Sequence, residues 1–383
     1  MRDRARAEFK ELGQLPPRSR KPRLFLPPTT IGLNLDIEAP LPRIAVVIPC
    51  YKVRDSVIDV IARMPAQVSD IVCVDDACTE NSGLHVERHV HDPRVRVIYH
   101  DHNRGVGGAM KTGYFAARDA GALIAVKIDG DGQMDPALIN DFISPIIAGE
   151  ADYTKGNRFF FPEDARGMPA IRLFSNAVLG FIAKLSTGYW PLFDPTNGYT
   201  ALHLDLLEIL NIRLVSDGYF FETDLLFRLN IARCVVKDVP MKAVYGAVKS
   251  NLKVSKVFLP FLVGNLQNFV KRIFYNYFLR DFQVASLEIL IGPPLLIFGV
   301  TFGVWNWWTA FSRHMPADIG SAALPTLLII LGVQFCLSAL HFDIRNVPVN
   351  PVHKWFGRRS GSAKSGGANA GHLEIVSSRR TSR

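Results

Sequence analysis

The chain has 383 residues, enough for one large domain or two ordinary ones with a substantial core. Hydrophobic residues make up 48% of it and the mean hydropathy is +0.13, so part of its apolar surface should face something other than water or a domain core. The net charge of +9 is concentrated at the two ends: residues 1–23 carry eight Lys and Arg against three Asp and Glu, and residues 343–383 carry eight against two. Nucleic-acid binding requires a basic groove through a folded domain, so this pattern argues against it.

The cysteines predict reduced, mostly buried thiols in a cytosolic compartment, because their number is odd and none has zinc-site spacing with histidine. They are Cys50, Cys73, Cys78, Cys234 and Cys336. His85, His89 and His91 lie in a polar, charged stretch, where a solvated helix end is a better interpretation than a metal site. The first residues lack the apolar stretch of a signal peptide, so the N-terminus is expected to stay in the cytoplasm.

Residues 1–43 are rich in Pro and Arg without a sustained period and are expected to form a mobile arm. Over residues 44–253, short β-rich runs alternate with amphipathic stretches, which predicts an α/β domain with a largely parallel sheet. The runs cover Ile44–Ile48, Ile71–Val74, Val95–Tyr99 and Leu123–Ile128, and helical stretches lie near Asp55–Met64, Gly105–Ala120 and Pro136–Ala148. Functional residues should directly follow the runs, because such sheets bind ligands at the carboxyl ends of their strands.

The region after residue 253 indicates a membrane protein. Aromatic and basic residues at helical spacing over 254–283 favour helices in the membrane interface over a core-packing helix. Two apolar stretches, about 286–311 and 320–342, are each long enough to cross a bilayer and predict a transmembrane hairpin over 284–343; a buried hairpin in a soluble protein is the alternative. Basic residues flank both outer ends, so both termini should face the cytoplasm at the inner membrane. Residues 344–383 are expected to form a basic, disordered tail.

Asp129 and Asp131 follow the fourth run two positions apart, so their carboxylates can point the same way while Gly130 lets the backbone turn. Paired hard oxygen ligands beside an open strand end suit Mg²⁺ or Mn²⁺, and Gln133 adds a carbonyl oxygen. The alternative is that Asp-Gly-Asp-Gly is ordinary turn chemistry.

Asp75 and Asp76 close the second run. A carboxylate there can accept hydrogen bonds from a base or a ribose hydroxyl, or it can cap the following helix, and we expect one Asp to do each. The glycine run from Asn103 to Gly113 lacks the second Gly that a Walker A loop needs before its Lys-Thr. Its glycines predict a helix start packed against the sheet, with Lys111 beside a phosphate.

Seven ordered motifs over about residues 44 to 253 resemble those of the inverting family 2 glycosyltransferases. They are Ile48-Pro-Cys-Tyr51, Val74-Asp-Asp76, the glycine run, Asp129-Gly-Asp-Gly-Gln133, Gly156-Asn-Arg158, Asp194-Pro-Thr-Asn-Gly198 and Phe221-Glu222. The chain looks most like the dolichyl-phosphate mannose synthase and bacterial polyprenyl-phosphate glycosyltransferase branch, whose bacterial members include proteins with a C-terminal transmembrane hairpin. Such an ordered set is more specific than any single motif.

The resemblance implies a GT-A fold, a nucleotide-diphosphate sugar donor and a Mg²⁺ or Mn²⁺ ion held by Asp129, Asp131 and Gln133, with Asp131 catalytic. It also implies a binding site for the nucleotide sugar. The residues assigned to that site are Pro49, Tyr51, Asp55, Asp75, Asp76, Lys111, Asp129 and Gly130.

The resemblance further implies that Arg158 and Arg172 are catalytic and grip the phosphate of the acceptor, with Lys249 assisting. From the residues alone, each arginine could equally make a surface ion pair. Two motifs depart from the family pattern. Relatives have Ser-Gly-Phe-Arg where this chain has residues 197–200, and Arg-x-x-Gly-Glu-Ser-Lys where it has residues 245–250, so two cationic contacts change.

The leading interpretation is an enzyme that loads one sugar onto polyprenyl phosphate, of the undecaprenyl or dolichyl type, at the cytoplasmic membrane face. Because the second pKa of a phosphate is about 6, this acceptor is mostly ionised near neutral pH and needs no strong base. A second interpretation is transfer to a saccharide hydroxyl, which needs a base such as Glu222 or Asp224. A third is a catalytically inactive membrane scaffold. Paired spans often associate, so a homo-oligomer formed through the hairpin is a further expectation.

Overall fold

The computed structural model describes residues 42–160, 170–242, 254–314 and 318–356. All of them belong to one unit of the chain. The predicted arm, except for its last two positions, lies outside the described residues, as do Lys249 and the tail beyond residue 356.

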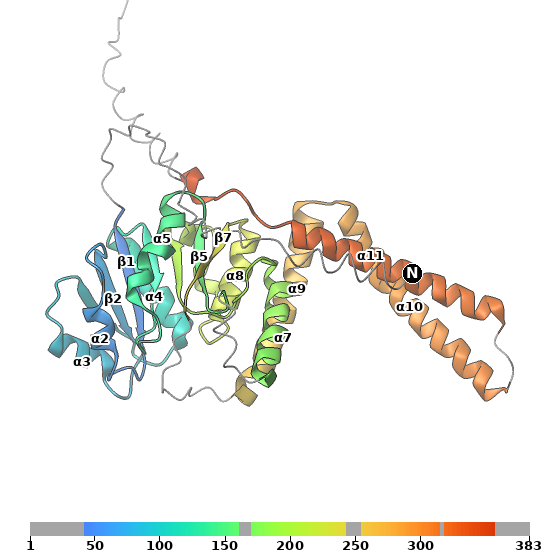
Figure 1. The fold of residues 1–383 in the computed structure, drawn as a ribbon, viewed down its shortest axis with the longest axis horizontal. Coiled ribbons are helices and arrows are strands. Elements are labelled where there is room, and N and C mark those ends of the chain that lie inside the picture. The colour runs from blue at the N-terminus through green and yellow to red at the C-terminus, as the bar shows by residue number, and fades with distance from the viewer. Residues whose placement is uncertain (1–41, 161–169, 243–253, 315–317, 357–383) are drawn as a thin grey trace, which may run out of the picture. The chain divides into compact units, whose positions relative to one another are not determined.

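A seven-stranded mixed sheet lies at the centre of the domain (Figure 1), in the order β3-β2-β1-β4-β6-β5-β7. Strands β1 to β4 pair in parallel, β6 is antiparallel to both of its neighbours, and β5 pairs in parallel with β7. The predicted α/β class is confirmed, and the four predicted runs coincide with the first four strands. The strands are β1 (Ile44–Cys50), β2 (Asp70–Asp75), β3 (Val95–Tyr99), β4 (Ile124–Lys127), β5 (Tyr153–Asn157), β6 (Thr200–His203) and β7 (Val236–Pro240).

Helices cover both faces of the sheet, so alternate side chains of β1 enter two different cores. Ala45 and Val47 pack in the core that includes residues of α4 and α8, whereas Val46 and Ile48 pack in the core that includes residues of α2 and α5. This burial on both faces is why the strands read as continuous apolar runs. The helices of the domain are α2 (Val57–Ala62), α3 (Ser82–His89), α4 (Gly105–Asp119), α5 (Ile139–Ile147), α7 (Ala170–Thr187) and α8 (Phe221–Ile231), with 3-10 turns at Pro136–Leu138, Leu204–Glu208 and Ile212–Leu214.

The glycine run forms the start of α4, as predicted. Gly113 lies directly against β1, where an added Cβ would stand 2.2 Å from Cγ1 of Val47. An added Cβ on Gly107 would lie 2.3 Å from the carbonyl oxygen of Ser216 and 2.8 Å from the ring of Phe221 in α8. Both glycines therefore permit close packing of α4, and the predicted helix start against the sheet is confirmed.

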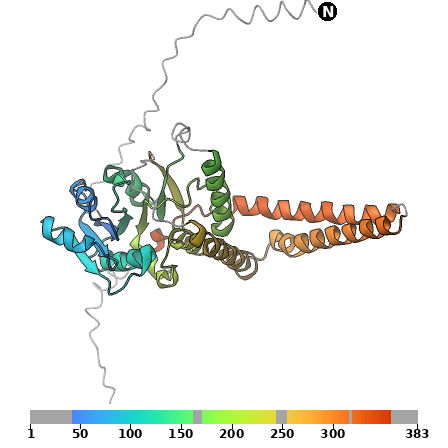
Figure 2. The same ribbon diagram turned by 90° about the horizontal axis from the view of Figure 1, so that it is seen from below.

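Two long helices, α10 (Val284–Ser312) and α11 (Ile319–Arg345), lie side by side (Figures 1 and 2). Each is long and apolar enough to cross a membrane, and only 11% and 17% of their most apolar windows are buried. Small residues bring the two backbones together: an added Cβ on Gly332 would lie 2.6 Å from the backbone nitrogen of Leu296. A core hairpin in a soluble protein would be mostly buried, so the low burial argues against that alternative.

Helix α9 (Val254–Phe274) has its polar side inward. Asn265, Asn268 and Arg272 are buried against the domain, where Asn265 accepts from Ser186 at 2.6 Å and Asn268 donates to Asp224 at 3.0 Å. The outward face is apolar and exposed; it carries Leu259, Leu262, Val263, Leu266, Val270 and Phe274. This is the reverse of a helix on a soluble protein, and it favours the predicted membrane interface over a core-packing helix.

A buried ion pair joins α9 to the end of α11. Arg272 donates to both carboxylate oxygens of Asp343, at 2.6 and 3.0 Å, and Arg272 is 1% exposed. Tyr277, in the π-helical turn Tyr275–Arg280, and Trp190 donate to the same carboxylate at 2.6 and 2.8 Å. Arg272 is therefore an internal cation that ties the domain to the hairpin.

The chain after α11 returns to the domain, so the prediction of a disordered tail from residue 344 is wrong for residues 344–356. The backbone nitrogens of Val352 and His353 donate to Asp152, at 2.9 Å each, and the His353 ring bonds the same carboxylate at 2.7 Å. Val347 and Phe356 pack against the hydrophobic core. The sequence concealed this contact because Asp152 lies about 200 residues earlier in the chain.

Asp343→Ala should lower the thermal stability of the detergent-solubilised protein, because it leaves the Arg272 guanidinium buried without its anion. Breaking one side of a buried pair typically costs about 3–5 kcal/mol. Thermal unfolding followed by tryptophan fluorescence measures the loss. Asp318→Ala, at the exposed start of α11, is the matched control, and an equal effect of the two substitutions would contradict this account.

Candidate active site

The carboxyl ends of β2, β1 and β4 lie next to one another and bring most of the predicted site residues to one edge of the sheet. Cys50 pairs with Asp75 across β1 and β2, and Val47 pairs with Lys127 across β1 and β4. The hydroxyl of Ser56, just after β1, donates to the carbonyl of Gly130 at 2.6 Å. The loops that carry Pro49 and Tyr51, the Asp75-Asp76 pair and the Asp129 to Gln133 motif therefore meet here.

The carboxylates of Asp75 and Asp76 both accept hydrogen bonds from backbone nitrogens. Asp75 accepts from the nitrogens of Cys78 and Gly83, at 2.7 and 2.6 Å, and so caps the start of α3. Asp76 accepts from the nitrogens of Arg104 and Gly105, at 2.8 and 2.7 Å, and so caps α4. Both carboxylates therefore stabilise helix starts, and the ligand role expected of one of them stays a prediction.

Three other predicted nucleotide-site residues lie at the end of β1 or just after it. Pro49 is half-buried at the end of the strand, whereas Tyr51 and Asp55 are exposed. Lys52 adopts a left-handed backbone conformation, with φ of 58°, and its ammonium lies 5.6 Å from the centre of the Tyr51 ring. An exposed aromatic ring beside a cation, next to the carboxylate loops, can stack on a planar base.

A buried lysine that the sequence analysis missed lies beneath Asp129. Lys127, the last residue of β4, donates to Oδ1 of Asp129 at 2.7 Å, lies 3.3 Å from Oε1 of Glu222, and donates to the carbonyl of Gly198 at 3.2 Å. Burial alone would lower the pKa of Lys127, but the carboxylates of Asp129 and Glu222 together raise it above its ordinary value. The one charged residue in an otherwise apolar run, two positions before Asp129, was the available signal.

Asp131 and Gln133 complete the same loop. Gly132 turns it with a φ of +80°, and the nitrogen of Gln133 donates to Oδ1 of Asp131 at 3.0 Å. Burial raises the pKa of the Asp131 carboxyl, and the neighbouring charge of Asp129 raises it further. The two carboxylates are close enough to interact electrically, as paired metal ligands are.

Hard oxygen donors are present at this loop, but the described residues contain no group of three or more His, Cys, Asp or Glu arranged as a metal site. Two carboxylates and one amide carbonyl fit Mg²⁺ or Mn²⁺ that takes the rest of its shell from water and substrate phosphate. Lys127 uses only one oxygen of Asp129 in the contacts above. The donor set therefore fits a divalent cation that arrives with a phosphorylated ligand.

The structure describes the three predicted acceptor-phosphate residues to different extents. Arg158 makes a bidentate ion pair with the buried Asp194, at 2.7 and 3.1 Å, as in the ion-pair alternative. Arg172 lies in the first turn of α7, where only its backbone is described, and Lys249 lies outside the described residues. The structure therefore places Arg158 against the loop of residues 194–198, while the side chains of the other two cations lie outside its described part.

Lys111 does not lie with the carboxylate loops. Its ammonium contacts Oδ1 of Asp217 at 2.5 Å and donates to the carbonyl of Val215 at 2.8 Å. The same loop approaches the start of α4 from the other side, where Gly107 donates to the carbonyl of Asp217 at 2.8 Å. Lys111 therefore fastens α4 to the loop before α8, and the expected phosphate contact stays a prediction.

The two candidate bases on α8 differ. Glu222 points to Lys127 at the sheet edge and is half-buried. Asp224 is buried and already accepts from the nitrogen of Ser216 at 2.9 Å and from Asn268 at 3.0 Å. Asp224 is therefore a structural carboxylate that holds α9 to α8, and it is poorly placed to take a proton from a substrate.

A second buried lysine, Lys155 of β5, donates to the carbonyl of Asn197 behind Arg158. Burial lowers its pKa to about 8. Since the unfolded lysine binds its proton up to about pH 10.4, the unfolded state binds more protons between pH 8 and that value, and stability should rise with pH in this window.

Thermal unfolding of the wild type and of Lys155→Met at pH 7.5 and 9.5 tests whether the lowered pKa of Lys155 makes stability depend on pH. The wild type should gain stability relative to the variant at the higher pH, because the variant has no proton to release. A difference between the two proteins that does not change with pH would show that burial does not lower the pKa of Lys155 in the folded state.

Lys127→Met should destabilise the protein by about 3–5 kcal/mol at neutral pH, because Asp129 and Glu222 then face each other without the cation between them. The second change Glu222→Gln removes one of these charges and should recover part of the loss. Denaturant unfolding of the single and double variants measures both effects. Absence of recovery in the double variant would contradict an electrostatic origin.

Comparison with known proteins adds to this geometry. A family model described as Glycosyl transferase family 2 matches residues 45–210. The chain is 34% identical over 152 residues to the UDP-N-acetylglucosamine–dolichyl-phosphate N-acetylglucosaminyltransferase of Methanococcus voltae, covering 40% of this chain and 60% of that relative, which is less than two thirds of its length. It is 27% identical over 203 residues to the undecaprenyl-phosphate mannosyltransferase of Micrococcus luteus, covering 52% and 82% of the two chains.

Among solved structures, the chain is similar to glucosyl-3-phosphoglycerate synthase from Mycobacterium tuberculosis in complex with Mn²⁺, UDP-glucose and phosphoglyceric acid. The TM-score is 0.45 at 17% identity, covering 60% of this chain and 79% of that one. The family match covers the strands and loops that build the edge described above. Residues 45–210 therefore match the glycosyl transferase family 2 model, on an α/β sheet that resembles the predicted GT-A fold.

Proposed function

We propose that this chain is a membrane-bound inverting glycosyltransferase that moves a sugar from a nucleotide-diphosphate sugar to polyprenyl phosphate of the undecaprenyl or dolichyl type. Support comes from the family 2 domain and from the relatives, whose names specify dolichyl phosphate and undecaprenyl phosphate as acceptors. The acceptor of such an enzyme is a lipid, and two helices of this chain are long and apolar enough to enter a membrane.

One observation carries the proposal: the domain with the carboxylate edge is fastened to the apolar hairpin through buried polar contacts. The Arg272–Asp343 pair and the contacts of Asp152 with His353 leave little freedom between the two parts. A domain held in this way, with the apolar side of α9 facing outward, would keep its active site at a lipid surface.

In this proposal the donor binds at the ends of β1, β2 and β4. Pro49, Tyr51 and Asp55 would line the nucleotide pocket beside Gly130, while Asp76 keeps α4 in position below it. Asp129, Asp131 and Gln133 would hold Mg²⁺ or Mn²⁺, which neutralises charge on the leaving nucleoside diphosphate when bound. Lys127 orients Asp129 from below, and Glu222 orients Lys127.

The acceptor needs positioning more than it needs a base. We assign Arg158 and Arg172, with Lys249, to the acceptor phosphate, because guanidinium groups bind phosphate oxygens in a bidentate manner. The bond between Arg158 and Asp194 fixes one such guanidinium before the acceptor arrives. The phosphate is already mostly ionised near neutral pH, since its second pKa is about 6, and can attack the anomeric carbon directly.

The proposed topology places the domain and both ends of the hairpin on the cytoplasmic side of the inner membrane. Lys271 and Arg280 precede α10, and Arg345 and Lys354 follow the apolar part of α11, so cations flank both outer ends of the hairpin. Cytoplasmic flanks carry such an excess of Lys and Arg. Donors for a cytoplasmic enzyme are soluble nucleotide sugars, which fits the open edge of the sheet.

Transfer to a saccharide hydroxyl is the second candidate, favoured by the position of Glu222 at the sheet edge. Its contact with Lys127 argues against it, because the carboxylate is already engaged by a buried cation at 3.3 Å. The inactive scaffold has no structural feature in its favour.

A transfer assay with the purified full-length protein separates these candidates. We expect sugar from one of UDP-GlcNAc, UDP-glucose or GDP-mannose to appear on undecaprenyl or dolichyl phosphate in Mn²⁺ or Mg²⁺, and to be lost in EDTA. Asp131→Asn should reduce the rate about 100-fold or more, since an electrostatic stabiliser of the leaving group is lost. Asp119→Asn, at the exposed end of α4, is the control.

Sugar on an oligosaccharide but never on lipid phosphate would overturn the proposed acceptor. Transfer that is equal in Asp131→Asn and in the wild type would overturn the assigned catalytic edge.

A further inference from the structure

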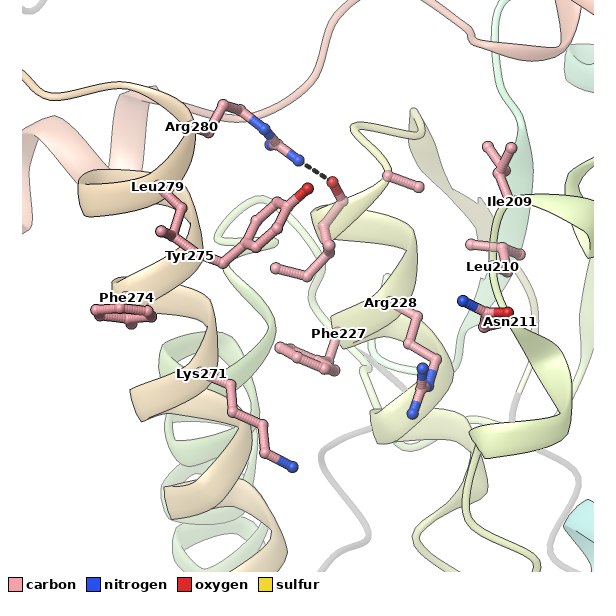
Figure 3. A pocket seen from close by; sticks show the side chains of 12 residues that line it. Ile209, Leu210, Asn211, Phe227, Arg228, Lys271, Phe274, Tyr275, Leu279 and Arg280 are labelled. Atoms are coloured by element: carbon pink, nitrogen blue, oxygen red, sulfur yellow. Dashed lines mark hydrogen bonds between the residues drawn. The ribbon is translucent and has the colours of Figure 1, made fainter.

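A cavity of about 640 Å³ lies at the far end of α8 from the carboxylate edge. It is bounded by the last turns of α8, residues 209–211, and the stretch from Lys271 to Arg280 (Figure 3). The first turn of α8 holds Glu222 beside Lys127, and the cavity begins at Phe227 and ends at Ala232. At 1.5 Å per residue Phe227 lies about 7.5 Å from Glu222 along the axis of α8, and no residue of the carboxylate edge lines the cavity, so the cavity is separate from the proposed active site.

The charged residues that line the cavity are all basic. Arg228 comes from α8, Lys271 from α9 and Arg280 from the π-helical turn, and no Asp or Glu lines it. Arg228 lies 3.8 Å from Asp224, and its buried Nε has no hydrogen-bond partner. Arg280 donates to the carbonyl of Ile231 and to Asn276, both uncharged. The cavity therefore keeps a net positive charge.

The other walls are apolar and open outward. Phe274 and Leu279 are 56% and 63% exposed, and Phe227 lies between α8 and α9, with Lys271 reaching toward the same space (Figure 3). Four residues after Arg280, α10 begins its apolar course. A ligand that satisfies this lining needs an anionic group for the cations and hydrocarbon for the rings, at the level where a membrane helix starts.

We propose that this cavity binds the phosphate headgroup of an anionic phospholipid. Lys271 and Arg280 contact the phosphate, Arg228 supplies charge from the domain side, and the acyl chains run along Phe274 and Leu279 toward α10. A bound lipid would bridge the domain, α9 and the start of the hairpin. The proposal goes beyond the transfer reaction, because it needs neither the sugar nucleotide nor the carboxylate edge.

Direct binding of fluorescent phosphatidylglycerol to the full-length protein in neutral detergent tests the proposal. We expect saturable binding that is much stronger than for phosphatidylcholine with the same acyl chains. One Lys or Arg near an anionic lipid surface is worth about 1 kcal/mol, so Lys271→Gln should weaken binding about fivefold. Lys237→Gln is the control, because it removes the same charge from an exposed lysine on β7, outside the cavity lining.

A second variant, Leu279→Gln, tests the hydrocarbon wall at an exposed position where misfolding is not expected, and it too should weaken binding. The proposal is overturned if phosphatidylcholine binds equally well, or if Lys271→Gln and Lys237→Gln have the same affinity. Complete displacement by millimolar inorganic phosphate would show a site for free phosphate instead. Preferential displacement by undecaprenyl phosphate would assign the cavity to the acceptor. All readouts are independent of transfer activity.

Discussion

The ion pair between Arg272 and Asp343 is the constraint on which the rest of the structure depends. A guanidinium with 1% of its surface exposed is tolerable only because a carboxylate from α11 meets it in bidentate geometry, with Tyr277 and Trp190 filling that carboxylate's remaining acceptor positions. The pair connects three segments that are far apart in the chain. It fixes which face of α9 is inward, and thereby which face is left for an apolar environment.

The inverted helix α9 follows from this constraint. Its inward asparagines find partners on α7 and α8, so rotation of the helix would bury its leucines against polar groups and leave Asp224 without Asn268. The apolar outward face cannot be hidden within the described part of the chain. Together with the hairpin, it gives a physical reason for holding a family 2 domain against a membrane, with the basic cavity at one end of α8 and the carboxylate edge at the other.

At the carboxylate edge, two buried lysines lie near acidic side chains. Lys127 and Lys155 lie inside the domain near Glu222 and Asp194, and their pKa shifts in opposite directions follow from the balance between burial and neighbouring carboxylates. Lys127 has two carboxylates close enough to outweigh burial, whereas for Lys155 burial outweighs the more distant charges. The position of the Asp129 carboxylate therefore depends on the buried charge of Lys127 and on Glu222 beside it. Gly198 leaves room for the Lys127 ammonium, because a Cβ there would stand 2.6 Å from it.

The sequence by itself determined the first four strands, the hairpin and the carboxylate loops, because burial on both faces makes these strands continuous apolar runs and the acids follow those runs directly. Only the tertiary structure decided which polar residues make structural contacts. Both Asp75 and Asp76 cap helices, Lys111 binds a loop, and Arg272 is an internal cation. The reason is physical. A side chain's local sequence fixes its direction along a strand or helix, but its partners come from segments up to about 200 residues away, and only the folded chain brings them within hydrogen-bonding distance.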